Sequence, residues 1–148
     1  MKKLIAFQSD TCRLAEVRAE VRAFLAAAGF DDCAAELMVL ALDEACTNVI
    51  RHAYGNSCKP VRLTLGLLRD RVRFVLRDYG RSCDPGQIRS RALEDIRPGG
   101  LGVHIIRQAF DTVDYAPQRR GTRLTLEKFL PVPPFAGPEV LPDPAIGH

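Results

Sequence analysis

Three short motifs that follow one another in a fixed order constrain the fold of this chain more than any other feature. The first is Glu44-Ala-Cys-Thr-Asn48, the second is Asp78-Tyr-Gly80, and the third is Gly99-Gly-Leu-Gly102. A helix with two polar residues, an Asp-x-Gly turn and a Gly-rich loop each occur in unrelated folds, so one of them alone says little. Their order and spacing together make the signal specific.

Length and composition predict a single globular domain. The chain has 148 residues, of which 47% are hydrophobic and 26% charged, enough for a core that folds by itself. The net charge is only +3 and its basic residues are scattered, which argues against nucleic acid as a partner. No apolar run approaches the roughly 20 residues that cross a bilayer, which argues against a membrane.

The cysteines and the N-terminus indicate the compartment. The apolar stretch after Met1 is too short for a signal peptide and is predicted to form a first strand. Five cysteines, an odd number without a Cys-x-x-Cys pair, fit neither a disulfide framework nor a zinc site. We expect a cytoplasmic protein whose reduced cysteines mostly pack in the core.

Hydrophobic periodicity predicts alternating helices and strands. Helical spacing runs over residues 11–29 and from Asp31 or Asp32 to about Tyr54, and a third helix is expected over 101–110. Period-2 alternation predicts an antiparallel hairpin over 61–67 and 71–77, and two further strands over 113–116 and 122–129, joined by a turn at 118–121.

Two segments lack such periodicity. Residues 79–99 collect Gly, Pro, Ser and charge, and are predicted to form a lid with one short helical turn. Residues 131–148 are so rich in proline that neither a helix nor a ladder is expected, and we expect an extended or disordered tail. The predicted domain therefore spans 1–130 and the tail 131–148.

Glu44 and Asn48 lie one turn apart on one face of the second predicted helix. An Asn amide oxygen suits Mg²⁺, which takes few protein ligands, and a carboxylate one turn away can accept a proton from an attacking hydroxyl. The alternative is a buried polar pair or a solvated helix face. The apolar neighbours Leu40, Ala41, Ala45 and Val49 favour the functional interpretation, because an unpartnered buried carboxylate is costly.

The other two motifs suit a nucleotide. Asp78 at a strand end can accept a hydrogen bond from an adenine amine, and Gly80 allows the base to approach the backbone; the alternative is an Asx turn. The glycines at 99–102 open a helix whose free N–H groups favour phosphate; the alternative is an ordinary loop. No Gly-Lys-Ser/Thr sequence is present there, which excludes a Walker P-loop.

The chain resembles the GHKL ATPase superfamily, and within it the bacterial anti-sigma factor serine kinases of partner-switching systems. The residues that carry the resemblance are 42–55, 77–85, 99–106 and Gly121-Thr122. The resemblance implies a Bergerat ATP-binding fold, an α/β (α+β) two-layer sandwich whose mixed, mainly antiparallel sheet is covered by helices on one face. It also implies ATP and Mg²⁺ as cofactors.

Roles follow from the resemblance residue by residue. It implies Glu44 as the general base, Asn48 as the Mg²⁺ ligand and Asp78 as the residue that recognises adenine. The remaining predicted nucleotide-binding residues are His52, in line with 44 and 48, and Gly80, Gly100, Leu101, Gly102 and Thr122. The chain departs from many relatives at Ser82, where they have glycine, so we expect a tighter or differently hydrogen-bonded local turn.

The function implied is an anti-sigma factor that phosphorylates a serine on a STAS-domain anti-anti-sigma protein. A sigma factor or another regulator, and a second copy in a homodimer, are the other partners implied. Arg13, Arg18 and Arg22 offer a candidate partner surface; the alternative is a solvated face paired with Glu16 and Glu20. Two other functions stay open: a non-catalytic nucleotide-dependent binding module, and a histidine-kinase catalytic domain, disfavoured because the first helix has no histidine.

Overall fold

A computed structural model of the chain describes residues 1–53, 59–80 and 101–131. The predicted lid after Gly80 and almost all of the predicted tail lie outside these residues. The described helices and strands are β1 Lys2–Gln8, the 3-10 helix η1 Thr11–Arg13, α1 Leu14–Ala27, α2 Asp32–Asn48, the π-helical turn η2 Val49–Ala53, β2 Pro60–Leu67, β3 Arg71–Asp78, α4 Leu101–Ala109, β4 Thr112–Pro117 and β5 Thr122–Phe129.

The strands described form one five-stranded sheet in the order β1-β2-β3-β5-β4. Each of the pairings between them is antiparallel. The β2–β3 hairpin is confirmed, with the Leu68 N–H donating to the Arg71 carbonyl across its turn at 2.8 Å. The β4–β5 turn closes where the Gln118 N–H donates to the Gly121 carbonyl at 3.0 Å, and Gly121 takes the left-handed φ of +79°.

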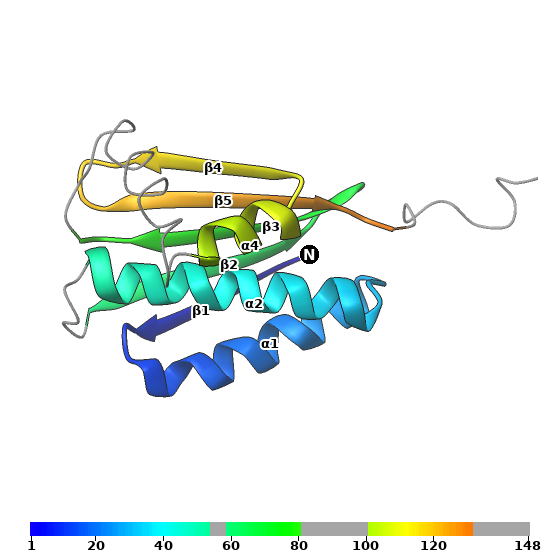
Figure 1. The fold of residues 1–148 in the computed structure, drawn as a ribbon, viewed down its shortest axis with the longest axis horizontal. Helices are drawn as coiled ribbons and strands as arrows, with labels where there is room; N and C mark the ends of the chain where they lie inside the picture. The colour runs from blue at the N-terminus through cyan, green and yellow to red at the C-terminus, as the bar shows by residue number, and fades with distance from the viewer. Residues whose placement is uncertain (54–58, 81–100, 132–148) are drawn as a thin grey trace, which may run out of the picture.

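Helices α1, α2 and α4 lie on one side of this sheet, so the molecule has two layers (Figure 1). Asp31 begins α2, because its Oδ1 accepts a hydrogen bond from the Ala34 N–H at 2.8 Å. Gly29, with φ of +98°, follows the end of α1. The α/β sandwich with helices on one face is therefore confirmed.

The core fills the space between the two layers. Phe74 of β3 is fully buried at its centre and contacts the rings of Phe24 and Phe110 edge to face, each at 5.8 Å between centroids. Helix α2 packs against both α1 and α4. In the described part of the chain, no helix combines the length and apolar character that crossing a membrane requires.

Two expectations differ from the structure in detail. The second predicted helix does not continue as a regular α-helix to Tyr54: it ends at Asn48, and η2 follows as a π-helical turn. Packing of most cysteines in the core was also wrong for the described ones, because Cys12 and Cys33 are exposed and Cys46 is buried. Burial, with a smaller effect from the nearby Asp43 carboxylate, raises the pKa of the Cys46 thiol to about 12.

The arginines of α1 contact α2 more than their own helix. Arg13 pairs with Glu16 within the helical turn, at 3.3 Å. Arg18 instead reaches Asp43 at 2.8 Å, and Arg22 reaches Glu36 at 2.6 Å, both on α2. The alternative of intrahelical pairs with Glu16 and Glu20 is therefore wrong for Arg18 and Arg22, because carboxylates of the neighbouring helix pair with them.

Candidate functional site

Three segments far apart in sequence meet at one end of the molecule. In Figure 1 the C-terminal end of α2, the end of β3 and the β4–β5 turn all lie at the left end. The strand register agrees, because Asp78, the last residue of β3, pairs with Val61 near the start of β2, only a few residues after η2. The fold thus brings the first two motifs and Thr122 to the same end of the sheet.

Asp78 is the buried acid of this end. Its residue surface is only 4% exposed, and Oδ1 accepts a hydrogen bond from the Gly80 N–H at 3.0 Å. The Thr122 N–H donates to the same carboxylate. Burial raises the pKa of Asp78 above its ordinary value, and these N–H groups with the charge of Arg77 oppose that rise. A carboxylate held by two backbone donors is fixed in position.

Gly121 lies directly against Asp78. A Cβ atom at this position would lie 2.1 Å from the Asp78 carbonyl oxygen and 2.7 Å from its Oδ1. Only glycine fits there, because any side chain would collide with backbone and the φ of +79° disfavours one as well. The close approach allows the Thr122 N–H to reach the carboxylate.

Arg77 ties the end of β3 to the β4–β5 turn. Its Nη1 donates to the backbone carbonyl of Asp78 and, at 2.8 Å, to that of Arg120. The guanidinium also lies over the Tyr79 ring, 4.3 Å from its centroid. Arg77 therefore holds the turn that carries Gly121 beside the strand that carries Asp78.

Glu44 and Asn48 are both half-buried on the last turns of α2. The residue before Glu44, Asp43, is held by Arg18 at 2.8 Å, and its carbonyl accepts a hydrogen bond from Thr47 Oγ1 at 2.9 Å. The helix that presents Glu44 is thus fixed to α1. A π-helical turn such as η2 is rare and occurs frequently at functional sites; it contains the backbone of His52.

The glycine motif is only partly within the described residues. Helix α4 begins at Leu101, so the backbone of Leu101 and Gly102 forms its first turn, and Gly100 lies outside. The helix packs against α2, which carries Glu44 and Asn48. The motif therefore stands before a helix, as predicted, and its contacts stay a prediction.

Sequence reasoning missed two residues of this end. Gly121 was interpreted as part of a turn and as the neighbour of Thr122, and its contact with Asp78 depends on the pairing of β3 with β5. Arg77 received no role, because nothing in a strand sequence shows that a guanidinium bonds main-chain carbonyls. The isolated glycine that ends the turn, next to a predicted site residue, was the one available signal.

Residues 7–128 match the family described as the histidine kinase-like ATPase domain. The chain belongs to this family. The match covers all described strands except part of β1 and β5, and all described helices. The resemblance that the motifs indicated is therefore confirmed.

Curated proteins that are similar in sequence to this chain are named serine-protein kinase RsbW. One from Bacillus cereus (strain AH187) is 32% identical over 92 residues, which cover 57% of this chain and 56% of the relative. One from Halalkalibacterium halodurans is 33% identical over 109 residues, covering 68% of this chain and 65% of the relative. The chain thus spans less than two thirds of the length of these relatives.

A solved structure shares the fold. The histidine kinase domain of the Erythrobacter litoralis EL346 blue-light activated histidine kinase aligns over 81% of this chain and 60% of its own, with a TM-score of 0.54. Sequence identity is 17%, so this similarity concerns the architecture alone.

Proposed function

We propose that this ATPase-family domain binds Mg·ATP and transfers the γ-phosphoryl group to a serine of a STAS-domain anti-anti-sigma protein, and that it acts as an anti-sigma factor. The observation that carries the proposal is the buried Asp78 carboxylate, held by the Gly80 and Thr122 N–H groups against Gly121. The names of the curated relatives support the kinase activity.

The residues of this end fit an adenine nucleotide. A buried carboxyl oxygen accepts a hydrogen bond from the adenine exocyclic amine, and discrimination against a base without that donor follows, because the Asp78 carboxylate would then lose this further hydrogen bond. Gly80 lacks the side chain that would keep the base away. Thr122 of the adjacent strand β5 holds the Asp78 carboxylate through its backbone N–H.

Phosphate chemistry is assigned to the other half of the site. Glu44 takes the proton of the serine hydroxyl as the bond from serine oxygen to phosphorus forms and the bond to the ADP oxygen breaks. Asn48 is the proposed Mg²⁺ ligand, and the metal, when bound, offsets phosphate charge. The first turn of α4, at Leu101 and Gly102, is proposed to bind phosphate oxygens through its N–H groups, together with the preceding Gly100 of the motif. His52 completes the proposed set.

Release of the phosphorylated STAS protein is proposed to leave the domain available for its other partner. A phosphate on the serine brings about two negative charges to the interface and disfavours the complex. The freed domain then binds a sigma factor or another regulator. We include a homodimer and a cytoplasmic location in the proposal.

Calorimetry with the full chain tests nucleotide binding first. Wild type is expected to bind Mg·ATP, and Asp78→Asn to lose at least about 100-fold in affinity, since one buried hydrogen bond to the base contributes roughly 3 kcal/mol. Asn48→Ala should lose the Mg²⁺ dependence. No binding by wild type would overturn the proposal.

Phosphoserine formation on the STAS protein tests transfer. Glu44→Gln is expected to bind Mg·ATP within about threefold of wild type but to transfer phosphate about 10²–10⁴-fold more slowly. Glu36→Gln is the matched control, because it changes an exposed carboxylate of the same helix about two turns from Glu44. Equal slowing in both variants would contradict the role of Glu44, and binding without transfer in wild type would leave a nucleotide-dependent binding module.

A further inference from the structure

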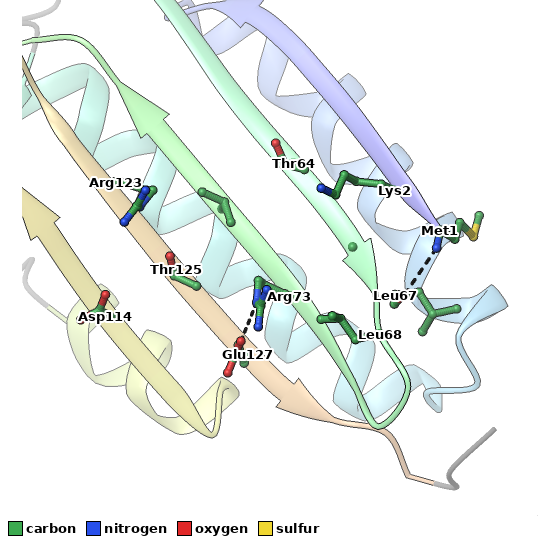
Figure 2. Close-up of a pocket in the computed structure, with 12 residues that line it drawn as sticks. Met1, Lys2, Thr64, Leu67, Leu68, Arg73, Asp114, Arg123, Thr125 and Glu127 are labelled. Carbon is green, nitrogen blue, oxygen red and sulfur yellow. Dashed lines mark hydrogen bonds and ion pairs between the residues drawn. The ribbon is translucent and has the colours of Figure 1, made fainter. Parts of the chain in front are cut away.

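The face of the sheet turned away from the helices carries a second surface of interest. Alternate residues of each strand point there, and Figure 2 looks onto this open face. A hollow of about 680 Å³ lies on it, bordered by Lys2, Arg73 and Arg123, with Thr64 and Thr125 between them. The proposed nucleotide site depends on residues of the opposite face and the strand ends.

One row across this face consists of three arginines. Arg62 of β2 pairs with Arg77 of β3, and Arg77 pairs in turn with Arg123 of β5. Directly opposite residues have Cβ atoms about 5 Å apart, and like charges in that position destabilise a sheet. The row, which we call the arginine row, is therefore an arrangement that the fold by itself does not favour.

Within the described residues, the central arginine of the row is the one that donates side-chain hydrogen bonds. Arg77 donates to the carbonyls of Asp78 and Arg120. Arg62 and Arg123 are exposed and form no ion pair with any described residue. Their charge is thus directed to solvent.

At the other end of the same face a carboxylate compensates two arginines, while Lys2 stays exposed. Glu127 accepts hydrogen bonds from Arg73 at 2.6 Å and from Arg71 at 2.9 Å, as Figure 2 shows for Arg73. Between the two ends lies a row in which Thr64, Val75 and Thr125 are successive neighbours, and Asp114 of β4 follows Thr125. This row forms the floor of the hollow, so uncompensated positive charge stands along one side of an open groove.

We propose that the arginine row and the hollow beside it bind an acidic segment of a partner protein. Guanidinium groups bind carboxylates in a bidentate manner, and those of Arg62 and Arg123 have no ion-pair partner among the residues that the structure describes. The small residues of the floor leave room for a peptide backbone. The inference does not depend on phosphate transfer, because none of these residues is assigned to it.

Two other occupants fit less well. A second copy in a two-fold dimer would set this face, in which basic side chains outnumber acidic ones, against itself. A nucleic acid would find no aromatic side chain on which a base could stack, because none lines the hollow in the described part of the chain. Charge complementarity therefore favours an acidic protein segment.

The test uses the full chain and a fluorescein-labelled peptide of alternating Glu and Thr, about eight residues long, which spans the sheet at about 3.3 Å per residue. Fluorescence anisotropy is expected to show binding that weakens with salt and falls at least about tenfold in Arg62→Gln/Arg123→Gln. The matched control is Arg13→Gln/Arg107→Gln, which removes two exposed helix arginines and should bind as wild type. A peptide of alternating Gln and Thr should not bind.

Charge reversal separates specific recognition from general attraction. Arg62→Glu/Arg123→Glu should prefer a Lys-Thr peptide, and Arg123→Gln should raise the melting temperature, because it relieves repulsion from Arg77. Equal loss of binding in the control, or tighter binding of a single-stranded oligonucleotide, would overturn the proposal. So would a dimer in sedimentation velocity that Arg62→Gln/Arg123→Gln dissociates, since a second copy would then occupy the face.

Discussion

Strand β3 presents two different surfaces along one run of residues. The even positions 72–78 are all buried, whereas the odd positions 71–77 are exposed or half-buried. On the inner side the strand packs against helices, so the shape of a side chain determines whether it is tolerated. On the outer side the strand is exposed to water, so the charge of a side chain has the larger effect. The comparison teaches that Asp78 is fixed because it belongs to the packed side, whereas its neighbour Arg77 belongs to the charged side and secures it from there.

Truncation of the buried Phe74 is expected to have the largest effect on stability of the substitutions in β3. Phe74→Ala removes the ring that contacts Phe24 and Phe110 and should lower the free energy of unfolding by about 3–5 kcal/mol. Val75→Ala, the next residue on the open side, should cost about 1 kcal/mol or less. Urea denaturation measures both. Similar losses would show that the two faces do not differ as described.

Gly121→Ala tests shape at the site itself. The added methyl group would collide with the Asp78 carbonyl, so we expect a loss of about 2–4 kcal/mol from the collision and the left-handed φ together. Gly29→Ala is the control, because its φ is +98° but nothing lies within 4 Å of the new Cβ, and it should cost about 1–2 kcal/mol. Thermal and urea unfolding report both values. Equal costs would mean that the Asp78 contact is unimportant.

Glu127→Gln tests charge on the open side. Desolvation raises the pKa of Glu127, but hydrogen bonds from Arg73 and Arg71 outweigh it and lower the pKa below its ordinary value. The ionised form therefore stabilises the fold above the unfolded-state pKa, about 4.5, and this contribution is lost as pH falls through the folded-state value. We expect about 0.5–1 kcal/mol at pH 7, after allowing for the exposed arginines, and a smaller difference from wild type in acid. A difference that does not change with pH would contradict this.

Asp78→Asn should have the smallest effect on stability. The folded protein retains the Asp78 proton to higher pH than the unfolded chain, because burial raises its pKa. Folding therefore takes up a proton above about pH 4. As pH rises, the Asp78 carboxyl consequently lowers the free energy of unfolding. Asn keeps the shape of the side chain without that penalty. At pH 7, the free energy of unfolding of the variant should therefore be within about 1 kcal/mol of the wild-type value, or higher than it. A large loss would assign Asp78 to the fold instead of to a ligand.

Much of the fold could be predicted because it depends on local pattern. The 3.6-residue spacing of α1 and the period-2 alternation of β2 and β3 report which side chains face an apolar layer, and the structure places them there. The π-helical turn after Asn48 could not be predicted in this way, because its hydrogen bonding leaves no distinct pattern in the sequence.

The chain by itself determined the motifs, the family and the side of each strand that is buried, since these depend on residue type and spacing. Tertiary structure alone decided that Gly121 contacts Asp78 and that the Arg18 side chain pairs with Asp43 of α2. It also decided that Arg62, Arg77 and Arg123 form one row. The reason is register: pairing of β3 with β2 and β5 joins residues up to about sixty positions apart, and no local pattern specifies which residues become neighbours.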